Sequence, residues 1–123
     1  MIKYATGKAA FQDQEPEKCW SEDELDLAVA EAKSQKCDFV VEYKHDNSGN
    51  IKKTILGWDV YILSYNMAVS YFRGSQYLTA LLGNLHRLWL NKHGNTHDEV
   101  YAWCPNNNML FNMHGFDYKR IVI

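Results

Sequence analysis

The sequence predicts a single α+β domain over residues 1–123, with a mostly antiparallel central sheet and flanking helices. Three observations predict this class. The length of 123 residues is typical of one domain and suffices to bury a core without disulfide or metal staples. Aromatic residues make up 14% of the chain and only 2 residues are proline, which excludes a disordered protein. Helical and strand-like apolar patterns alternate along the chain.

The amino-terminal part is expected to hold a short strand, a polar loop and a well-capped helix. Residues 2–11 suit a strand, and residues 12–19 suit a loop. Ser21 and Glu24 have the spacing of a capping box, in which each side chain bonds the backbone amide of the other residue. Acidic residues in the first turn and lysines at the other end suit the helix dipole. This pattern predicts a helix over about 21–36.

A hairpin is expected next. Residues 38–43 are rich in β-branched and aromatic side chains, which favour a strand. Residues 46–50 form a turn cluster, and strand character resumes over 51–63. Residues 64–72 suit either a short strand or the first turns of a long helix.

The carboxyl-terminal half is expected to alternate between helix and strand. Residues 76–92 have apolar side chains at three- and four-residue steps, which predicts a helix ending at Gly94. Residues 99–104 favour a strand. Residues 109–114 suit a helical turn or two, and residues 116–123 suit a terminal strand.

The net charge of −2 conceals an uneven distribution. Residues 1–31 carry 8 acidic and 3 basic side chains, whereas residues 32–123 carry 7 acidic and 10 basic ones. The overall balance argues against a non-specific nucleic-acid binder, which would normally be basic. The acidic segment suits either a solvated helix face or a surface that meets a basic partner.

The cysteines and the apolar segments indicate a compartment. Cys19, Cys37 and Cys104 form an odd set without a CxxC pair, which favours reduced thiols. The amino terminus lacks the apolar run of a signal peptide, and no stretch reaches the roughly 20 apolar residues of a membrane span. A cytoplasmic protein without a membrane partner is therefore expected.

A metal site is not expected. His93, His97 and Cys104 are candidate zinc ligands, since His-x3-His can share one helix face. Gly94 interrupts that helix, and no fourth ligand is obvious.

Two stretches resemble motifs of the GNAT family of N-acetyltransferases. Residues 69–82, in which Arg73-Gly74 precedes a leucine-rich helix, are similar to the family's strand–turn–helix for acetyl-CoA. Residues 110–116 look like the family's Leu-Tyr-x-x-x-Gly-Phe segment. The likeness covers roughly residues 38–123 and implies a GNAT-like fold. The chain departs from the family at Phe111, which stands where the family has tyrosine.

The resemblance implies an enzyme that transfers an acetyl group from acetyl-CoA to an amine. A glycine-containing turn at a helix amino terminus offers amides and a positive dipole to a pyrophosphate. The residues expected to bind the cofactor are Arg73, Gly74, Ser75, Gln76 and Asn106. Glu42 and Asp59 are candidates for the general base. In the family, the tyrosine that Phe111 replaces often acts as the general acid. Tyr118, or alternatively Tyr61, would take this role here.

The alternative is a non-catalytic protein-binding module, such as a phage-type inhibitor or accessory protein on a degenerate fold. The charge split and the 8 Tyr, 5 Phe and 4 Trp of the chain favour it. Tyrosine and tryptophan suit anchor positions at an interface, and they suit a core equally well. A homodimeric structural protein is a third possibility.

Overall fold

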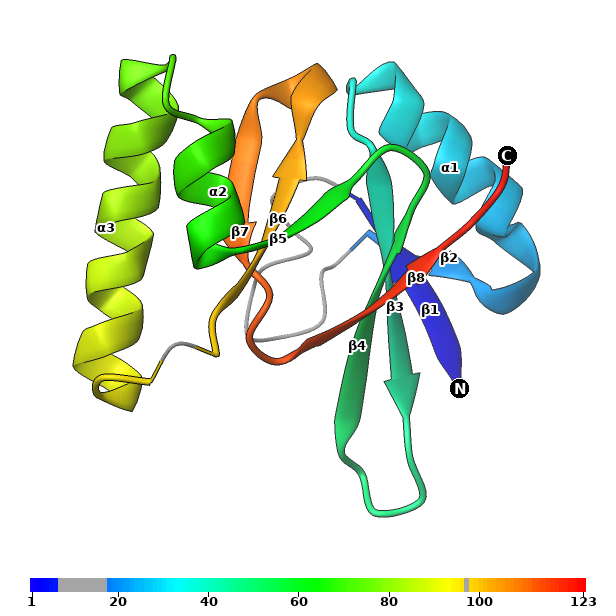
Figure 1. Cartoon of the computed structure of the whole chain (residues 1–123). Coiled ribbons are helices and arrows are strands. Elements are labelled where there is room, and N and C mark those ends of the chain that lie inside the picture. Colours follow the sequence, from blue (N-terminus) through cyan, green and yellow to red (C-terminus); the bar gives the residue numbers. More distant parts are fainter. Residues whose placement is uncertain (7–17, 97) are drawn as a thin grey trace. The chain divides into compact units, whose positions relative to one another are not determined.

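The computed structural model describes residues 1–6, 18–96 and 98–123. The chain folds into two compact units. Unit 1 comprises Met1–Val60 and Gly115–Ile123, and unit 2 comprises Tyr61–His114. The described residues form a mixed α+β arrangement with mostly antiparallel sheets and helices, which confirms the predicted fold class (Figure 1).

Unit 1 is built on a five-stranded sheet with the order β2-β1-β3-β4-β8. Every neighbouring pair in it is antiparallel except β4 and β8, which run parallel. Its strands are β1 (Ile2–Ala5), β2 (Trp20–Ser21), β3 (Phe39–His45), β4 (Ile51–Gly57) and β8 (Phe116–Arg120). Part of the predicted first strand, over 2–11, and most of the predicted loop at 12–19 lie outside the described residues.

The predicted hairpin is present as β3 and β4. The two strands pair from Phe39 opposite Gly57 to His45 opposite Ile51. In the turn, a carboxylate oxygen of Asp46 accepts hydrogen bonds from the amides of Ser48 and Asn50 at 2.9 and 2.8 Å. This Asx-type turn explains why the polar cluster at 46–50 reverses the chain.

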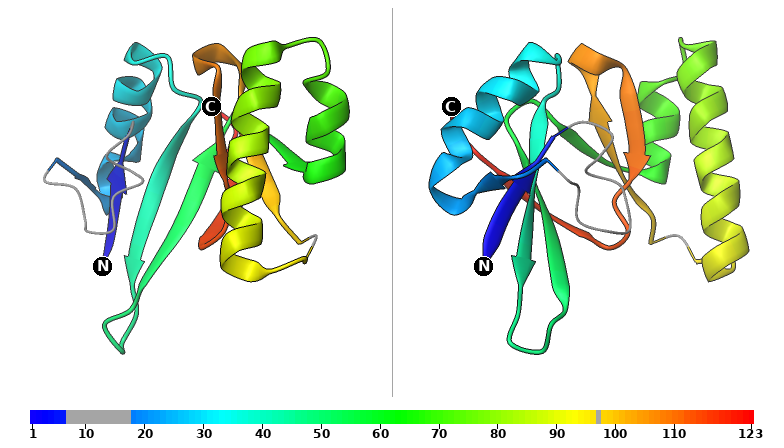
Figure 2. Two further views of the ribbon diagram at one scale, coloured as in Figure 1. Left: turned by 90° about the vertical axis from the view of Figure 1, so that its left-hand side faces the viewer. Right: turned by 180° about the vertical axis from the view of Figure 1, so that it is seen from behind.

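The first helix begins with one turn of 3-10 helix, η2 (Glu22–Glu24), and continues as α1 (Leu25–Ser34). The Ser21 amide donates to the Glu24 carboxylate at 3.0 Å, as the capping-box spacing predicts. α1 packs on one face of the sheet (Figure 2). Its buried side chains, with those they contact on the sheet, are Ala28, Val29, Ala32, Tyr4, Val40 and Leu56.

The strand expected over 51–63 is wrong as one element. β4 ends at Gly57, and the next strand, β5 (Tyr61–Ser64), belongs to the sheet of unit 2. A Cβ at Gly57 would lie 2.8 Å from Cγ2 of Val60 and 3.2 Å from Cε2 of Tyr118. The chain therefore turns tightly at a position where only glycine fits without rearrangement.

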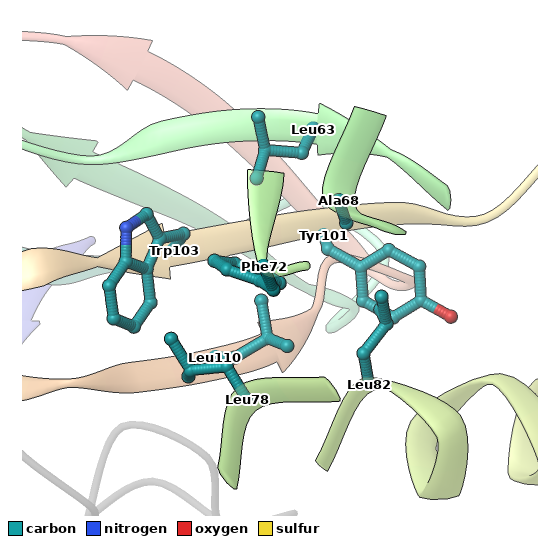
Figure 3. Packing of buried hydrophobic residues seen from close by; sticks show 8 residues of the cluster. All are labelled: Leu63, Ala68, Phe72, Leu78, Leu82, Tyr101, Trp103 and Leu110. Carbon is teal, nitrogen blue, oxygen red and sulfur yellow. The ribbon is translucent and has the colours of Figure 1, made fainter. Parts of the chain in front are cut away.

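Unit 2 is a three-stranded antiparallel sheet with two helices on one face. The order is β5-β6-β7, with β6 at Val100–Cys104 and β7 at Met109–Asn112. The helices are α2 (Tyr65–Tyr71) and α3 (Gln76–His93). Figure 3 shows their core, formed by Leu63, Ala68, Phe72, Leu78, Leu82, Tyr101, Trp103 and Leu110.

Residues 64–72 form a helix that is separate from the long one. The Ser64 hydroxyl caps α2 by accepting the Met67 amide at 3.3 Å, and the Phe72 amide closes the helix on the Ala68 carbonyl. Gly74 lies in the turn between α2 and α3, so neither helix includes it. The helix predicted over 76–92 is confirmed, and Gly94 ends it at φ +73°.

The helical turn expected over 109–114 is wrong, because Met109–Asn112 form the strand β7. Met109 pairs with Cys104 and Leu110 with Trp103. A 3-10 turn, η3 (Pro105–Asn107), reverses the chain between the strands, with Asn108 in the left-handed region at φ +49°. The terminal strand is confirmed as β8, which ends at Arg120.

Candidate functional site

The residues expected to bind acetyl-CoA lie at one end of unit 2. Arg73, Gly74, Ser75 and Gln76 form the turn that opens α3, and Asn106 lies in η3, directly after β6. Phe72 packs edge-on against Trp103 near the end of β6, with ring centroids 5.2 Å apart. The two segments accordingly occupy the same end of this unit (Figure 1).

The local geometry of this turn differs from the strand–turn–helix that the resemblance implies. A helix, α2, precedes the turn. The Ser75 hydroxyl already accepts the Leu78 amide at 3.2 Å. Gly74 does not have a positive φ, and a Cβ there would meet no atom within 4 Å. A larger residue would therefore fit at position 74. Neither the backbone conformation nor the surrounding space requires glycine there.

Of the expected catalytic residues, Glu42, Asp59 and Tyr118 lie in unit 1, whereas the alternative acid Tyr61 lies in unit 2. Glu42 is on β3, Tyr118 is on β8, and Asp59 follows β4. Glu42 pairs with Thr54, whereas Tyr118 pairs with the next residue of β4, Ile55. Paired residues point to the same face of a sheet and successive residues to opposite faces. Glu42 and Tyr118 therefore lie on opposite faces and do not form one acid–base pair.

Unit 2 contains a buried polar cluster that is not predicted from the sequence. Nδ1 of His86, on α3, lies 2.8 Å from Oε1 of Glu99, without the angles of a hydrogen bond. The Glu99 side chain is 0% exposed. The ring of Tyr65 stacks on His86 with centroids 3.8 Å apart. An acidic residue next to an apolar strand, at Glu99-Val100, was the signal that could have indicated it.

The same cluster changes the ionisation of Tyr101. Burial, as the larger cause, and the negative charge of Glu99 together raise the pKa of Tyr101 to about 12. The Asn112 side chain acts in the opposite direction. The Asn112 amide thus lies near the phenol, but neither the Tyr101 hydroxyl nor the Asn112 side-chain nitrogen has a well-formed hydrogen bond among the described residues. The cluster is an interior network whose polar atoms are incompletely satisfied.

The exposed aromatic side chains of the described residues gather in unit 2. Tyr61, Tyr71 and Tyr77 are 45%, 57% and 61% exposed. The rings of Tyr61 and Tyr71 lie 6.1 Å apart, and Met67, one helical turn before Tyr71, is 56% exposed. We call Tyr61, Met67 and Tyr71 the tyrosine patch.

The tryptophans, by contrast, belong to the two cores. Trp89 and Trp103 are buried in unit 2. Trp20 and Trp58 are half-buried and pack against the core of unit 1. Of the two roles expected for the tryptophans, core packing is the one observed.

The cysteines and the histidines were further candidates for chemistry. Cys19, Cys37 and Cys104 are present as thiols, and Cys104 is buried in β6. His97, one of the considered zinc ligands, lies outside the described residues. In the described ranges, no group of three His, Cys, Asp or Glu side chains is placed to hold a metal ion.

The helices of the described segments are too short or too polar to cross a membrane. Comparisons of the chain with family models, with curated proteins and with solved structures find no match.

Proposed function

We propose that this chain is a non-catalytic protein-binding module and that the tyrosine patch is its contact surface. The observation that carries the proposal is the exposure of Tyr61 and Tyr71, at 45% and 57%, with their rings in mutual contact. Tyrosine combines a large apolar ring with a hydroxyl, and it is enriched among the residues that dominate binding energy.

The short helix α2 supports this proposal. Of its seven residues only Ala68 is buried, so most of the helix contributes little to the core. Met67 and Tyr71 are four residues apart and share one face of it, and that face is in solvent. Exposed apolar side chains in a contiguous set mark an interaction surface more often than scattered ones do.

The chemistry of the patch indicates the kind of partner. A flexible methionine such as Met67, one helical turn from Tyr71, adapts to an apolar pocket on another protein. Arg73, two residues beyond Tyr71, is exposed and would add a charged contact at the rim. The expected partner is a folded protein with an apolar depression bordered by hydrogen-bond acceptors.

Affinity capture from an extract of the source cells, with paired variants, tests the proposal. The unmodified chain should retain one stoichiometric protein, and Tyr71→Ser should lower its recovery at least tenfold, the loss of about 1.4 kcal/mol. Leu27→Ser is the control, since Leu27 is 52% exposed in unit 1 and lies outside the patch. Equal recovery with Tyr71→Ser and with Leu27→Ser would refute the patch as the contact surface.

Light scattering distinguishes a second copy of the chain from another protein. A dimer that Tyr71→Ser dissociates would identify the partner as the chain itself. A monomer in both variants, together with a captured protein, would identify a heterologous partner.

Acetyl-CoA binding is a second candidate function. It is favoured by the placement of Arg73 and Asn106 at the same end of unit 2, beside the amino terminus of α3. In this case the chain would transfer an acetyl group from acetyl-CoA to an amine. Calorimetry with acetyl-CoA tests it, with Arg73→Gln expected to weaken binding and Arg87→Gln, farther along α3, to leave it unchanged. Absence of binding heat at millimolar acetyl-CoA would exclude this function.

A further inference from the structure

Unit 2 contains a pocket that is separate from the tyrosine patch and from the turn before α3. Its volume is about 250 Å³, which is below the range of roughly 300–1,000 Å³ that is typical of drug-sized ligands. The second half of α3 forms one side, with Leu85 and Leu88, and the end of β7 forms the other. A pocket of this size suits a small molecule.

Three aromatic rings form its wall. The rings of Trp89 and His93 stack with centroids 3.9 Å apart. His114 meets both of them edge-on, at 5.4 Å from Trp89 and 4.5 Å from His93. Such an arrangement presents flat apolar surface to a planar ligand.

Hydrogen bonds hold the wall in place. Nε1 of Trp89 donates to the Thr96 carbonyl at 3.4 Å, and Nδ1 of His93 lies 3.3 Å from the Trp89 carbonyl. The Asn112 side-chain oxygen accepts the His114 amide at 2.7 Å, which fixes the start of the turn that carries His114. The wall is therefore preorganised, which lowers the entropic cost of binding.

The polar side chains that line the pocket provide hydrogen-bond donors and one cation. Lys92, His93 and His114 all line it, and no aspartate or glutamate of the described residues does. Lysine is cationic at neutral pH, and histidine rings donate hydrogen bonds from N–H. A ligand with a negative group attached to a flat ring would stack on the aromatic wall and accept hydrogen bonds from these donors.

We propose that this pocket binds a small aromatic carboxylate. The ring of the ligand lies against Trp89, His93 and His114, and its carboxylate faces Lys92. The proposal is independent of the protein-binding function, because the pocket and the tyrosine patch share no residue.

A matched pair of probes tests the class of ligand. The full chain is titrated with 2-naphthoate and with 2-naphthalenemethanol, which have the same rings but differ in the charge of the substituent. The indole N–H signal of Trp89 and the ring signals of His93 and His114 are followed by NMR. We expect 2-naphthoate to shift these signals and to bind about fivefold more tightly than the alcohol, the gain of one partly exposed charge pair.

Variants then separate charge from stacking. Lys92→Met should weaken 2-naphthoate about fivefold and leave the alcohol unchanged. Lys33→Met is the matched control, because Lys33 is an exposed lysine in the last turn of α1. His114→Phe should keep most of the affinity for the alcohol, whereas His114→Ala should lower it, because only the alanine removes the ring.

Two results would overturn the proposal. One is equal affinity of the unmodified chain for the two probes. The other is the absence of shifts at Trp89, His93 and His114 when 2-naphthoate reaches millimolar concentration. His114 and Lys92 are exposed, so their substitution does not remove core side chains.

Discussion

Glu99 carries a carboxylate into the interior of unit 2, with His86 as its neighbour at 2.8 Å. A buried carboxylate left without an opposing group is costly, because it loses its hydration and gains nothing in return. The His86 side chain is only 19% exposed, so water would not readily reach Glu99 if the imidazole were removed.

His86→Phe should therefore destabilise the protein by about 3 kcal/mol. The phenyl ring keeps the stacking on Tyr65, so the loss isolates the polar contact. The double variant His86→Phe/Glu99→Leu should recover most of this stability, because no charge remains buried. Urea unfolding of the two single variants, His86→Phe and Glu99→Leu, and of the double variant provides a double-mutant cycle. Unchanged stability of His86→Phe would contradict the role given to the contact between His86 and Glu99.

Tyr101 makes stability depend on pH in the alkaline range. Burial and the charge of Glu99 raise its pKa from 10.0 in the unfolded chain to about 12 in the folded one. The free energy of unfolding is therefore unaffected by Tyr101 below pH 10. It falls as the pH rises toward 12, because the Tyr101 hydroxyl loses its proton at a lower pH in the unfolded chain than in the folded one. The slope should stay below the roughly 1.4 kcal/mol per pH unit of one proton.

Tyr101→Phe should flatten this slope while changing stability at pH 8 by less than about 1 kcal/mol, because the hydroxyl has no well-formed partner among the described residues. Urea unfolding at pH 8 and between pH 10 and 12 measures both effects. A parallel pH dependence in the variant and the unmodified chain would show that Tyr101 is not the group that titrates.

At the scale of the elements, the sequence predicts the helices and turns whose formation depends on contacts between residues close in the chain. The helix at 76–92 and the hairpin around the turn at 46–50 rest on periodicity and on turn chemistry, and both are present, although the second hairpin strand ends at Gly57. β7 was mistaken for a helical turn, because its strand character comes from pairing with β6 rather than from its own residues. The break between β4 and β5 likewise depends on a close approach of Val60 and Tyr118 to Gly57.

Gly57→Ala should destabilise the protein by about 1–3 kcal/mol, since the new Cβ would lie 2.8 Å from a side-chain atom of Val60. Gly74→Ala is the matched control, because no atom lies within 4 Å of the added Cβ and φ is not positive. Thermal or urea unfolding measures both, and equal stabilities would contradict the tight turn at Gly57.

Gly74→Ala also discriminates between the two candidate functions. An acetyl-CoA site that needs close approach of the backbone to the pyrophosphate would lose affinity with this variant, although its fold would be intact. A protein-binding module would retain its partner, because Gly74 lies outside the tyrosine patch. Calorimetry with acetyl-CoA and capture of the partner give the two readouts.

At the scale of the whole molecule, the sequence predicted the fold class but not the division of the chain into two compact units. The candidate site was less predictable than the fold. Glu99 and His86 meet through tertiary packing across 13 positions, and nothing in their local sequence pairs them. Residue type alone makes Glu42 and Tyr118 candidates for catalysis, whereas the register of strand pairing places them on opposite faces of the sheet.

The whole-molecule distribution of aromatic residues is what favours a binding role. The tryptophans support the two cores, while the exposed tyrosines gather in unit 2. Much of the amino-terminal acidity has a local cause, since Glu22, Asp23 and Glu24 occupy the first turn of a helix. The acidic segment therefore adds little support for a basic partner.

Site-specific photo-crosslinking tests the binding role most directly. A photoreactive phenylalanine analogue is placed at position 71 in the tyrosine patch, and at position 27 as the control, in chains expressed in the source cells. We expect one discrete adduct of the chain with a partner from position 71 and none from position 27. No adduct from position 71, or the same adducts from both positions, would contradict the assignment of the tyrosine patch as the contact surface.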